Sequence, residues 1–309
     1  MPGNTSFSMD ALVADGLRKE FGKVVAVRDV TFAVAPGQTL GLIGPNGAGK
    51  TTTMRMILGV LVPDGGRIVW QGRVVDASMR HRFGYLPEER GLYGRMDVRE
   101  HVEYFARLHG LGDRDARRRA DEWLERLDVA QYAARPCGEL SKGNQQKVQI
   151  ACAAVHAPEL LVLDEPFSGL DPVNAEMLAG VVRELHARGT ALVLSSHQMW
   201  QLEQLCDCYC IVSGGESRAT GTLQELRRRI PVRVLRIDPV TDAVRSVLAG
   251  VAGARAVDSG DGVAFEVPVE TDVGKLLRRL APVAEIARFE ALEPSLREIY
   301  LATVGESVA

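Results

Sequence analysis

The sequence predicts an α/β fold followed by a small α+β domain of ferredoxin-like topology. A short apolar strand over residues 39–43 leads into a glycine-rich loop over 44–51, and a helix follows directly. Two further apolar strands, 160–163 and 190–194, each end in polar residues. From residue 232 onward, strand and helix patterns follow one another in the order β-α-β-β-α-β.

Strand patterns surround the glycine-rich loop. Residues 12–39 alternate in the way of paired strands, which we expect over 12–14, 24–27 and 30–34. Strand patterns over 67–70 and 73–75 flank Gln71-Gly72, which is a hairpin signal. Together these segments predict an antiparallel sheet beside the loop.

The loop itself fits G-x-x-x-x-G-K-[ST], the pattern of a phosphate-binding loop. Its glycines allow backbone angles and close approaches that a Cβ would forbid, so N–H groups can turn toward a polyphosphate. The following helix adds the partial positive charge of its N-terminus. We expect Lys50 to reach the β- and γ-phosphates and Thr51 Oγ1 to hold Mg²⁺. The predicted phosphate-binding residues are Gly44, Pro45, Asn46, Gly47, Ala48, Gly49, Lys50, Thr51 and Thr52.

A helical block precedes the second apolar strand. Between 97 and 156, apolar residues recur three to four positions apart, for example over 98–105 and 120–127. Leu140–Gln146 then opens a helix after a glycine-containing loop. This start is a second helix N-terminus that can face phosphate.

Two carboxylates end the strand at 160–163. Asp164 would lie beside the phosphate loop and hold the Mg²⁺ shell. Glu165 is one residue further and so points differently, where we expect it to polarise a water for in-line attack. The strand at 190–194 is followed by Ser195-Ser196-His197.

The C-terminal segments predict a separate module. Strand patterns cover 232–237, 254–257, 263–267 and 285–292, with Gly260-Asp261-Gly262 between the second and the third. Helical patterns cover 240–248, 271–280 and 294–303. The module has neither a His/Cys/Asp cluster nor a phosphate loop, so its sequence favours a regulatory or interaction role.

In this combination and order, the motifs resemble those of the nucleotide-binding subunit of an ATP-binding cassette (ABC) transporter. The resemblance covers about residues 10–225. It implies a P-loop NTPase cassette with a RecA-like core, an antiparallel β subdomain and a helical subdomain over about 90–155. An accessory or regulatory domain over 230–309 would follow it. Residues 294–300 resemble the tail of bacterial ABC export ATPases that carry such an extension.

The resemblance also implies roles for residues of this chain. Residues 44–52 are the Walker A loop, and 160–165 are Walker B with Glu165 as the catalytic carboxylate. His197 is the switch histidine that senses the γ-phosphate, and Phe21 stacks on the adenine ring. Residues 168–171 are the D-loop, which ends in Asp171. The signature covers the ATP of a partner subunit with Ser141, Lys142, Gly143 and Asn144.

Two departures from the family pattern are visible. Glu88 follows Tyr85-Leu86-Pro87, where the family usually has Gln. Its carboxylate can still offer an oxygen to Mg²⁺, alongside Thr51 and Asp164, but it adds a negative charge and loses the amide donor. The signature is LSKGN rather than LSGGQ. Lys142 either attracts phosphate or faces solvent, and the sequence leaves both open.

Net charge and hydropathy limit which partners the sequence predicts. A net charge of −3 gives no reason to expect bulk binding to nucleic acid. No apolar run approaches the ~20 residues of a membrane span, and the first ten residues lack the apolar core of a secretory signal. We therefore expect any pore to lie on a separate permease, and the resemblance implies a cytoplasmic protein that is peripheral on the inner face of the cell membrane.

Three of the five cysteines are close together, at 206, 208 and 210. On a single strand they would share one face and suggest a metal site. We expect Cys206 to end a helix and Cys208 to begin a strand, so packing in the core is favoured.

The predicted function is ATP hydrolysis that powers transport, with export expected, through a membrane permease. In the family, two ATP molecules join two such subunits head to tail, as a homodimer or heterodimer. The alternative is a soluble ABC ATPase that acts on a ribosome or nucleic-acid complex. One cassette and no sustained heptads disfavour that alternative. A regulatory binder with an inactive site is disfavoured because Lys50, Asp164, Glu165 and His197 are all present.

The resemblance also implies a coupling surface. The segment 88–96 would form a groove for a short permease helix, with Leu92, Tyr93 and Met96 as apolar contacts. The alternative is an ordinary packed loop.

Overall fold

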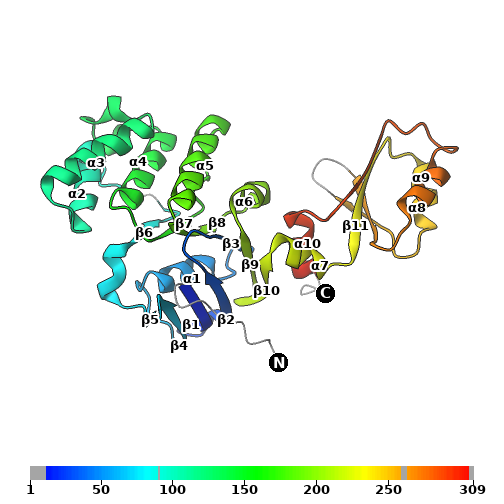
Figure 1. Ribbon diagram of the computed structural model, residues 1–309, viewed down its shortest axis with the longest axis horizontal. Helices are drawn as coiled ribbons and strands as arrows, with labels where there is room; N and C mark the ends of the chain where they lie inside the picture. The colour runs from blue at the N-terminus through cyan, green and yellow to red at the C-terminus, as the bar shows by residue number, and fades with distance from the viewer. Residues whose placement is uncertain (1–11, 90, 259–262, 306–309) are drawn as a thin grey trace. The chain divides into compact units, whose positions relative to one another are not determined.

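The computed structural model describes residues 12–89, 91–258 and 263–305. The chain divides into two compact units between Thr220 and Gly221 (Figure 1). Within the described ranges, no helix is long and apolar enough to span a membrane. The predicted domain limits, 10–225 and 230–309, stay a prediction, and their outermost residues lie outside these ranges.

A ten-stranded sheet organises the first unit, in the order β5-β4-β1-β2-β10-β9-β3-β8-β7-β6. Its parallel part places β3 beside β8 and β7 beside β6. Every residue of β3, β7 and β8 is buried, which is expected for parallel strands covered on both faces. These strands are β3 (Thr39–Ile43), β6 (Phe83–Leu86), β7 (Leu160–Asp164), β8 (Ala191–Ser195) and β9 (Cys208–Ser213).

The antiparallel part differs from the prediction in one respect. The three expected strands over 12–34 are two long ones, β1 (Leu12–Phe21) and β2 (Val24–Val34). They pair with register shifts, one of which falls at the exposed residues Arg28 and Asp29. The backbone N–H groups of these two residues donate to the Gly215 carbonyl oxygen instead, so β2 stays a single strand. The predicted hairpin is confirmed as β4 (Gly65–Trp70) and β5 (Arg73–Val74). Strand β10 (Glu216–Thr222) meets β2 and joins the two parts into one sheet.

The helical block is confirmed, and its three helices lie together at one end of the unit (Figure 1). They are α2 (Val98–Leu108), α3 (Asp113–Arg126) and α4 (Lys142–Ala154). The other helices are α1 (Lys50–Ile57), α5 (Pro172–Ala187) and α6 (Met199–Leu205). Short 3₁₀ helices cover Ala77–Arg82, Ala130–Tyr132 and Cys137–Glu139.

The second unit has the predicted β-α-β-β-α-β order. Its sheet order β12-β13-β11-β14 places the first strand in the centre, and all three pairs are antiparallel. Leu235 and Phe265 of the sheet pack with Leu248 and Leu276 of the helices. The elements are α7 (Leu223–Arg228), β11 (Val232–Asp238), α8 (Asp242–Ala249), β12 (Arg255–Asp258), β13 (Val263–Pro268), α9 (Val273–Leu280), β14 (Arg288–Leu292) and α10 (Leu296–Gly305). The predicted turn at Gly260-Asp261-Gly262 lies outside the described residues.

Candidate functional site

The glycine-rich loop connects β3 to α1 at the carboxyl end of the parallel sheet. Gly49 has φ +98°, and a Cβ there would collide with the Ala26 carbonyl oxygen. A Cβ on Gly44 would overlap the Val212 carbonyl oxygen. The loop can therefore lie this close to β2 and β9 only because these positions are glycine.

Lys50 is the cation of the loop. It is 9% exposed, and its Nζ donates hydrogen bonds to the carbonyl oxygens of Gly44 (2.8 Å) and Pro45 (3.2 Å). The backbone carbonyl groups of the loop thus hold the Lys50 ammonium group inside it. A bound polyphosphate would offer it charged acceptors, which form stronger hydrogen bonds than carbonyl oxygens do.

Asp164 ends β7 and is 1% exposed. Its Oδ2 accepts a hydrogen bond from Thr51 Oγ1 (2.8 Å), and its Oδ1 accepts one from Ser195 Oγ (2.7 Å). Two neighbouring segments, the start of α1 and the end of β8, thus hold this carboxylate in place. The Thr51 hydroxyl and the Asp164 carboxylate are the hard oxygen ligands that Mg²⁺ prefers.

Glu165 adopts a left-handed backbone conformation, with φ +50°. Its N–H donates to Ser195 Oγ (2.9 Å), and its Oε2 lies 2.8 Å from His197 Nδ1. This conformation costs a non-glycine residue about 1–2 kcal/mol, and such strain is found most often at functional sites. The turn points the Glu165 side chain toward His197 rather than along the strand after Asp164.

One cavity of about 390 Å³ brings these groups together. It is lined by Phe21, Ala26, Asn46, Gly47, Gly49, Lys50, Thr51, Thr52, Glu88, Asp164 and Glu165. Phe21 is 49% exposed although it is aromatic, so its ring is available to a ligand. Among these residues, three carboxylates face one ammonium group. The excess of negative charge fits a site that takes a divalent cation together with an anionic ligand.

Residues 27–168 match the family described as ABC transporter, and 221–304 match the C-terminal domain of the DrrA1-3-like ATP-binding proteins. The uncharacterized ABC transporter ATP-binding protein YhaQ of Bacillus subtilis is 41% identical over 95% of this chain and 98% of its own length. This chain belongs to the ABC transporter ATP-binding family. It is an ATP-binding cassette ATPase of the kind that powers transport.

Two further comparisons agree. The daunorubicin resistance ATP-binding protein DrrA3 of Streptomyces coeruleorubidus is 35% identical over 96% of both chains. The solved structure of an ATP binding subunit of an ABC transporter is 35% identical, with a TM-score of 0.67 over 71% of this chain and 92% of that one. The predicted P-loop cassette fold is thereby confirmed.

The predicted signature residues of this ABC ATPase, 141–144, do not line the nucleotide cavity. Ser141 caps α4, its Oγ accepting from the Asn144 N–H (3.4 Å), and neither it nor Lys142 lines the cavity. Ser141 and Lys142 are both exposed. Gly143 lies close to the side chains of Asn174 and Leu170, and Asp171 of the predicted D-loop caps α5 by accepting from the Asn174 N–H (3.0 Å). The segments predicted as signature and D-loop are therefore neighbours, and neither contributes to the lining of this cavity.

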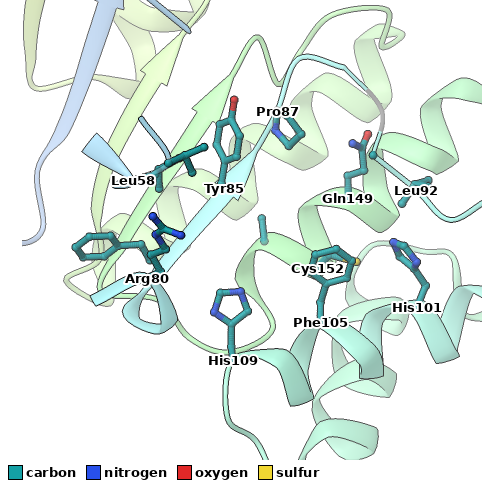
Figure 2. A pocket seen from close by; sticks show the side chains of 14 residues that line it. Leu58, Arg80, Tyr85, Pro87, Leu92, His101, Phe105, His109, Gln149 and Cys152 are labelled. Atoms are coloured by element: carbon teal, nitrogen blue, oxygen red, sulfur yellow. The ribbon is translucent and has the colours of Figure 1, made fainter. Parts of the chain in front are cut away.

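A second cavity, of about 280 Å³, lies between the sheet and the helical block (Figure 2). Of the predicted coupling segment, Leu92 lines it, Met96 is half-buried, and Arg90 lies outside the described residues. Tyr93 is 53% exposed, and its ring packs edge-on against His101 and Tyr104. The cavity is lined by Leu58, Val60, Arg80, Phe83, Tyr85, Pro87, Gly91, Leu92, His101, Phe105, His109, Gln149, Cys152 and Ala153.

The clustered cysteines take the predicted places. Cys206 follows α6 and Cys208 begins β9, so the three do not share one strand. Burial raises the pKa of the Cys206 and Cys210 thiols, which keeps them protonated.

Two histidines beside the second cavity predict a pH-dependent stability. Burial lowers the pKa of His101 to about 4 and that of His156, stacked on His109, to about 3. Because these values lie below the unfolded value of 6.5, the unfolded chain binds more protons in acid. The stabilisation is complete above pH 6.5 and is lost as pH falls toward 4. We expect a loss of roughly 2 kcal/mol per histidine between pH 7 and pH 5.

Urea unfolding followed by tryptophan fluorescence measures this effect. All three tryptophans, at 70, 123 and 200, lie in the first unit, so the signal reports that unit. The His101→Phe variant should lose about half of the pH dependence. An unchanged dependence in the variant would show that His101 does not carry it.

Proposed function

We propose that this ABC subunit binds Mg²⁺·ATP in the first cavity and hydrolyses it there. The observation that carries the proposal is Glu165 held by His197 next to the Asp164–Thr51 pair. Lys50 would contact the β- and γ-phosphates, and Phe21 would stack on the adenine ring. Mg²⁺ would neutralise phosphate charge when bound, with Thr51, Asp164 and Glu88 as its protein ligands. Glu165 would accept the proton of the attacking water.

The subunit would act as a head-to-tail dimer, with itself or with a second ATP-binding subunit. Two features support this arrangement. The cavity lies at the phosphate loop with no signature residue in its lining, and the N-terminus of α4 begins at the exposed residues Ser141 and Lys142. A helix N-terminus of this kind suits the γ-phosphate held by a partner.

We infer that the transport direction is export. The relatives described as daunorubicin resistance, linearmycin resistance and Nod factor export ATP-binding proteins support this inference. The subunit would then work in the cytoplasm, on the inner face of the membrane, bound to a separate permease. No observation favours the ribosome or nucleic-acid alternative.

The second cavity would receive a segment of that permease. Its lining is mostly apolar, and it includes Pro87 and Leu92 on either side of Glu88, which lines the nucleotide cavity. A segment seated there would press on the loop that carries one of the proposed Mg²⁺ ligands. Movement at one cavity would in this way change the geometry of the other.

Replacement of Tyr93 tests this docking. Tyr93→Ala should reduce recovery of the permease with the tagged subunit by several-fold, because the exposed ring beside the cavity is removed. ATP hydrolysis by the isolated subunit should change less than twofold. Co-purification from a strain that expresses both proteins measures the first, and phosphate release measures the second.

Tyr132→Ala is the matched control, since this half-buried tyrosine contacts Arg135 and lines neither cavity. Normal recovery of the permease by Tyr93→Ala would remove this residue from the docking surface.

A further inference from the structure

Two buried polar groups on the helical side of the second cavity have no hydrogen-bond partner. His101 on α2 is 1% exposed and Gln149 on α4 is 5% exposed. His101 Nδ1 and Gln149 Oε1 both lack a hydrogen bond. Figure 2 shows both side chains on the same side of the cavity, with Leu92 beside them. A buried polar atom left unpaired costs about 1–3 kcal/mol, so this polar pair marks a place for a ligand group.

The rest of the lining is apolar and aromatic. Phe83, Phe105 and Leu58 contribute to the walls. Arg80 is the one charged residue among the described lining residues, and its guanidinium donates to the Gly59 carbonyl oxygen. The volume of about 280 Å³ is just below the range of about 300–1,000 Å³ for drug-sized ligands. The cavity thus suits one inserted side chain with an apolar body.

The polar pair limits the chemistry of the end of that side chain. Burial lowers the pKa of His101 to about 4, so its imidazole is neutral at pH 7 and offers one donor and one acceptor. Gln149 Oε1 is an acceptor, while its Nε2 points to the Glu89 carbonyl oxygen at 3.5 Å. A hydroxyl group can donate to one member of the pair and accept from the other. An ammonium or carboxylate would be desolvated without a countercharge at the pair.

We propose that the second cavity is the seat of one phenol-bearing side chain, a tyrosine of the permease segment, and that His101 and Gln149 recognise its hydroxyl. This inference rests on the docking proposed above and adds which chemical group of the permease the cavity recognises. The phenyl ring would fill the apolar space, and the hydroxyl would satisfy the two orphaned atoms. Hydrogen-bonding sites discriminate strongly against ligands that lack the matching group, so the pair would select one permease over others.

Two small probes test this without any permease. p-Cresol reproduces the tyrosine side chain, and toluene reproduces that of phenylalanine. Ligand-observed NMR on the full-length subunit should give p-cresol an affinity about tenfold higher than that of toluene, as expected for one or two net hydrogen bonds. In His101→Phe and in Gln149→Met, the two probes should bind equally.

Gln131→Met is the matched control, because Gln131 is exposed and donates to the Asp128 carbonyl oxygen outside the cavity. It should keep the tenfold preference. Circular dichroism checks the fold of each variant, and Gln149→Met carries the test if His101→Phe does not fold. Equal binding of the two probes to the unmodified subunit would overturn the proposal, as would a preference that survives both substitutions.

A competition experiment separates this proposal from the docking itself. p-Cresol, but not toluene, should release the co-purified permease at concentrations that saturate the subunit. A preference for p-cresol without release would assign the phenol seat to a ligand other than the permease and overturn the tyrosine assignment. If Tyr93→Ala did not change recovery of the permease, this result would contradict the role of Tyr93 in docking but not the recognition of a phenol by His101 and Gln149.

Discussion

Glu165→Gln should lower steady-state ATP turnover at least ~100-fold and leave ATP binding unchanged. An amide keeps the shape of the side chain but cannot accept a proton from water, and general-base contributions typically reach 10²–10⁴-fold. Asp164, Thr51 and Lys50, which would hold Mg²⁺ and phosphate, are untouched. Phosphate release at saturating Mg²⁺·ATP measures turnover, and equilibrium dialysis measures binding.

Glu176→Gln is the control for this change. Glu176 lies on α5, pairs with the exposed Arg183 and lines no part of the nucleotide cavity. It should keep full activity. Turnover of Glu165→Gln within threefold of the unmodified subunit would mean that another group activates the water.

The same substitution should also accumulate the ATP-bound dimer. If ATP joins two subunits and hydrolysis separates them, slowing hydrolysis leaves the joined state populated.

The His197→Ala variant tests the role of the histidine separately from that of Glu165. It removes the Nδ1 partner of Glu165 but leaves the carboxylate, so it tests positioning rather than proton acceptance.

The nucleotide cavity could be predicted because its chemistry constrains short, contiguous segments. Glycine is required at 44 and 49 by the close approach of neighbouring carbonyl oxygens, and this requirement is visible in the sequence. A strand ending in Asp164-Glu165 is visible for the same reason. The helical block and the β-α-β-β-α-β unit follow from local periodicity.

Long-range pairing could not be predicted in this way. The polar residues Arg28 and Asp29 interrupt the apolar pattern of β2, and the register with β1 shifts there, but the strand continues because their backbone N–H groups donate to the Gly215 carbonyl oxygen. The junction of β10 with β2 joins residues nearly two hundred positions apart, at Glu216 and Asp29. No local pattern contains such information.

The polar pair of the second cavity was also missed. In the sequence, His101 is one histidine on the apolar side of a helix, and Gln149 is one glutamine in another. Only the packing of α2 and α4 around the cavity shows that both lack partners. The predicted segment 88–96 does contribute to the edge of this cavity through Leu92. The polar residues on the other side of the cavity could be recognised only in the structure.

Ser141→Arg should abolish ATP-driven dimerisation without affecting ATP binding by the monomer. Ser141 caps α4. In the proposed dimer, the N–H groups of that first turn would contact the partner's γ-phosphate. An arginine side chain would occupy the space in front of them and remove the cap. In the Glu165→Gln background, the dimer dissociation constant should rise at least ~100-fold, or about 2.7 kcal/mol.

Size-exclusion chromatography with ATP and Mg²⁺ measures this, and two further variants make the result specific. Ser141→Asp keeps a good N-cap but places a negative charge where phosphate would approach, so it should also block dimerisation. Ser246→Arg adds the same arginine to the exposed face of α8 and should dimerise normally. If Ser141→Asp dimerised and Ser141→Arg did not, bulk rather than phosphate binding would explain the loss. Dimer formation by both Ser141 variants would place the α4 N-terminus outside the interface, and the group that completes the ATP site in trans would have to come from elsewhere on the subunit.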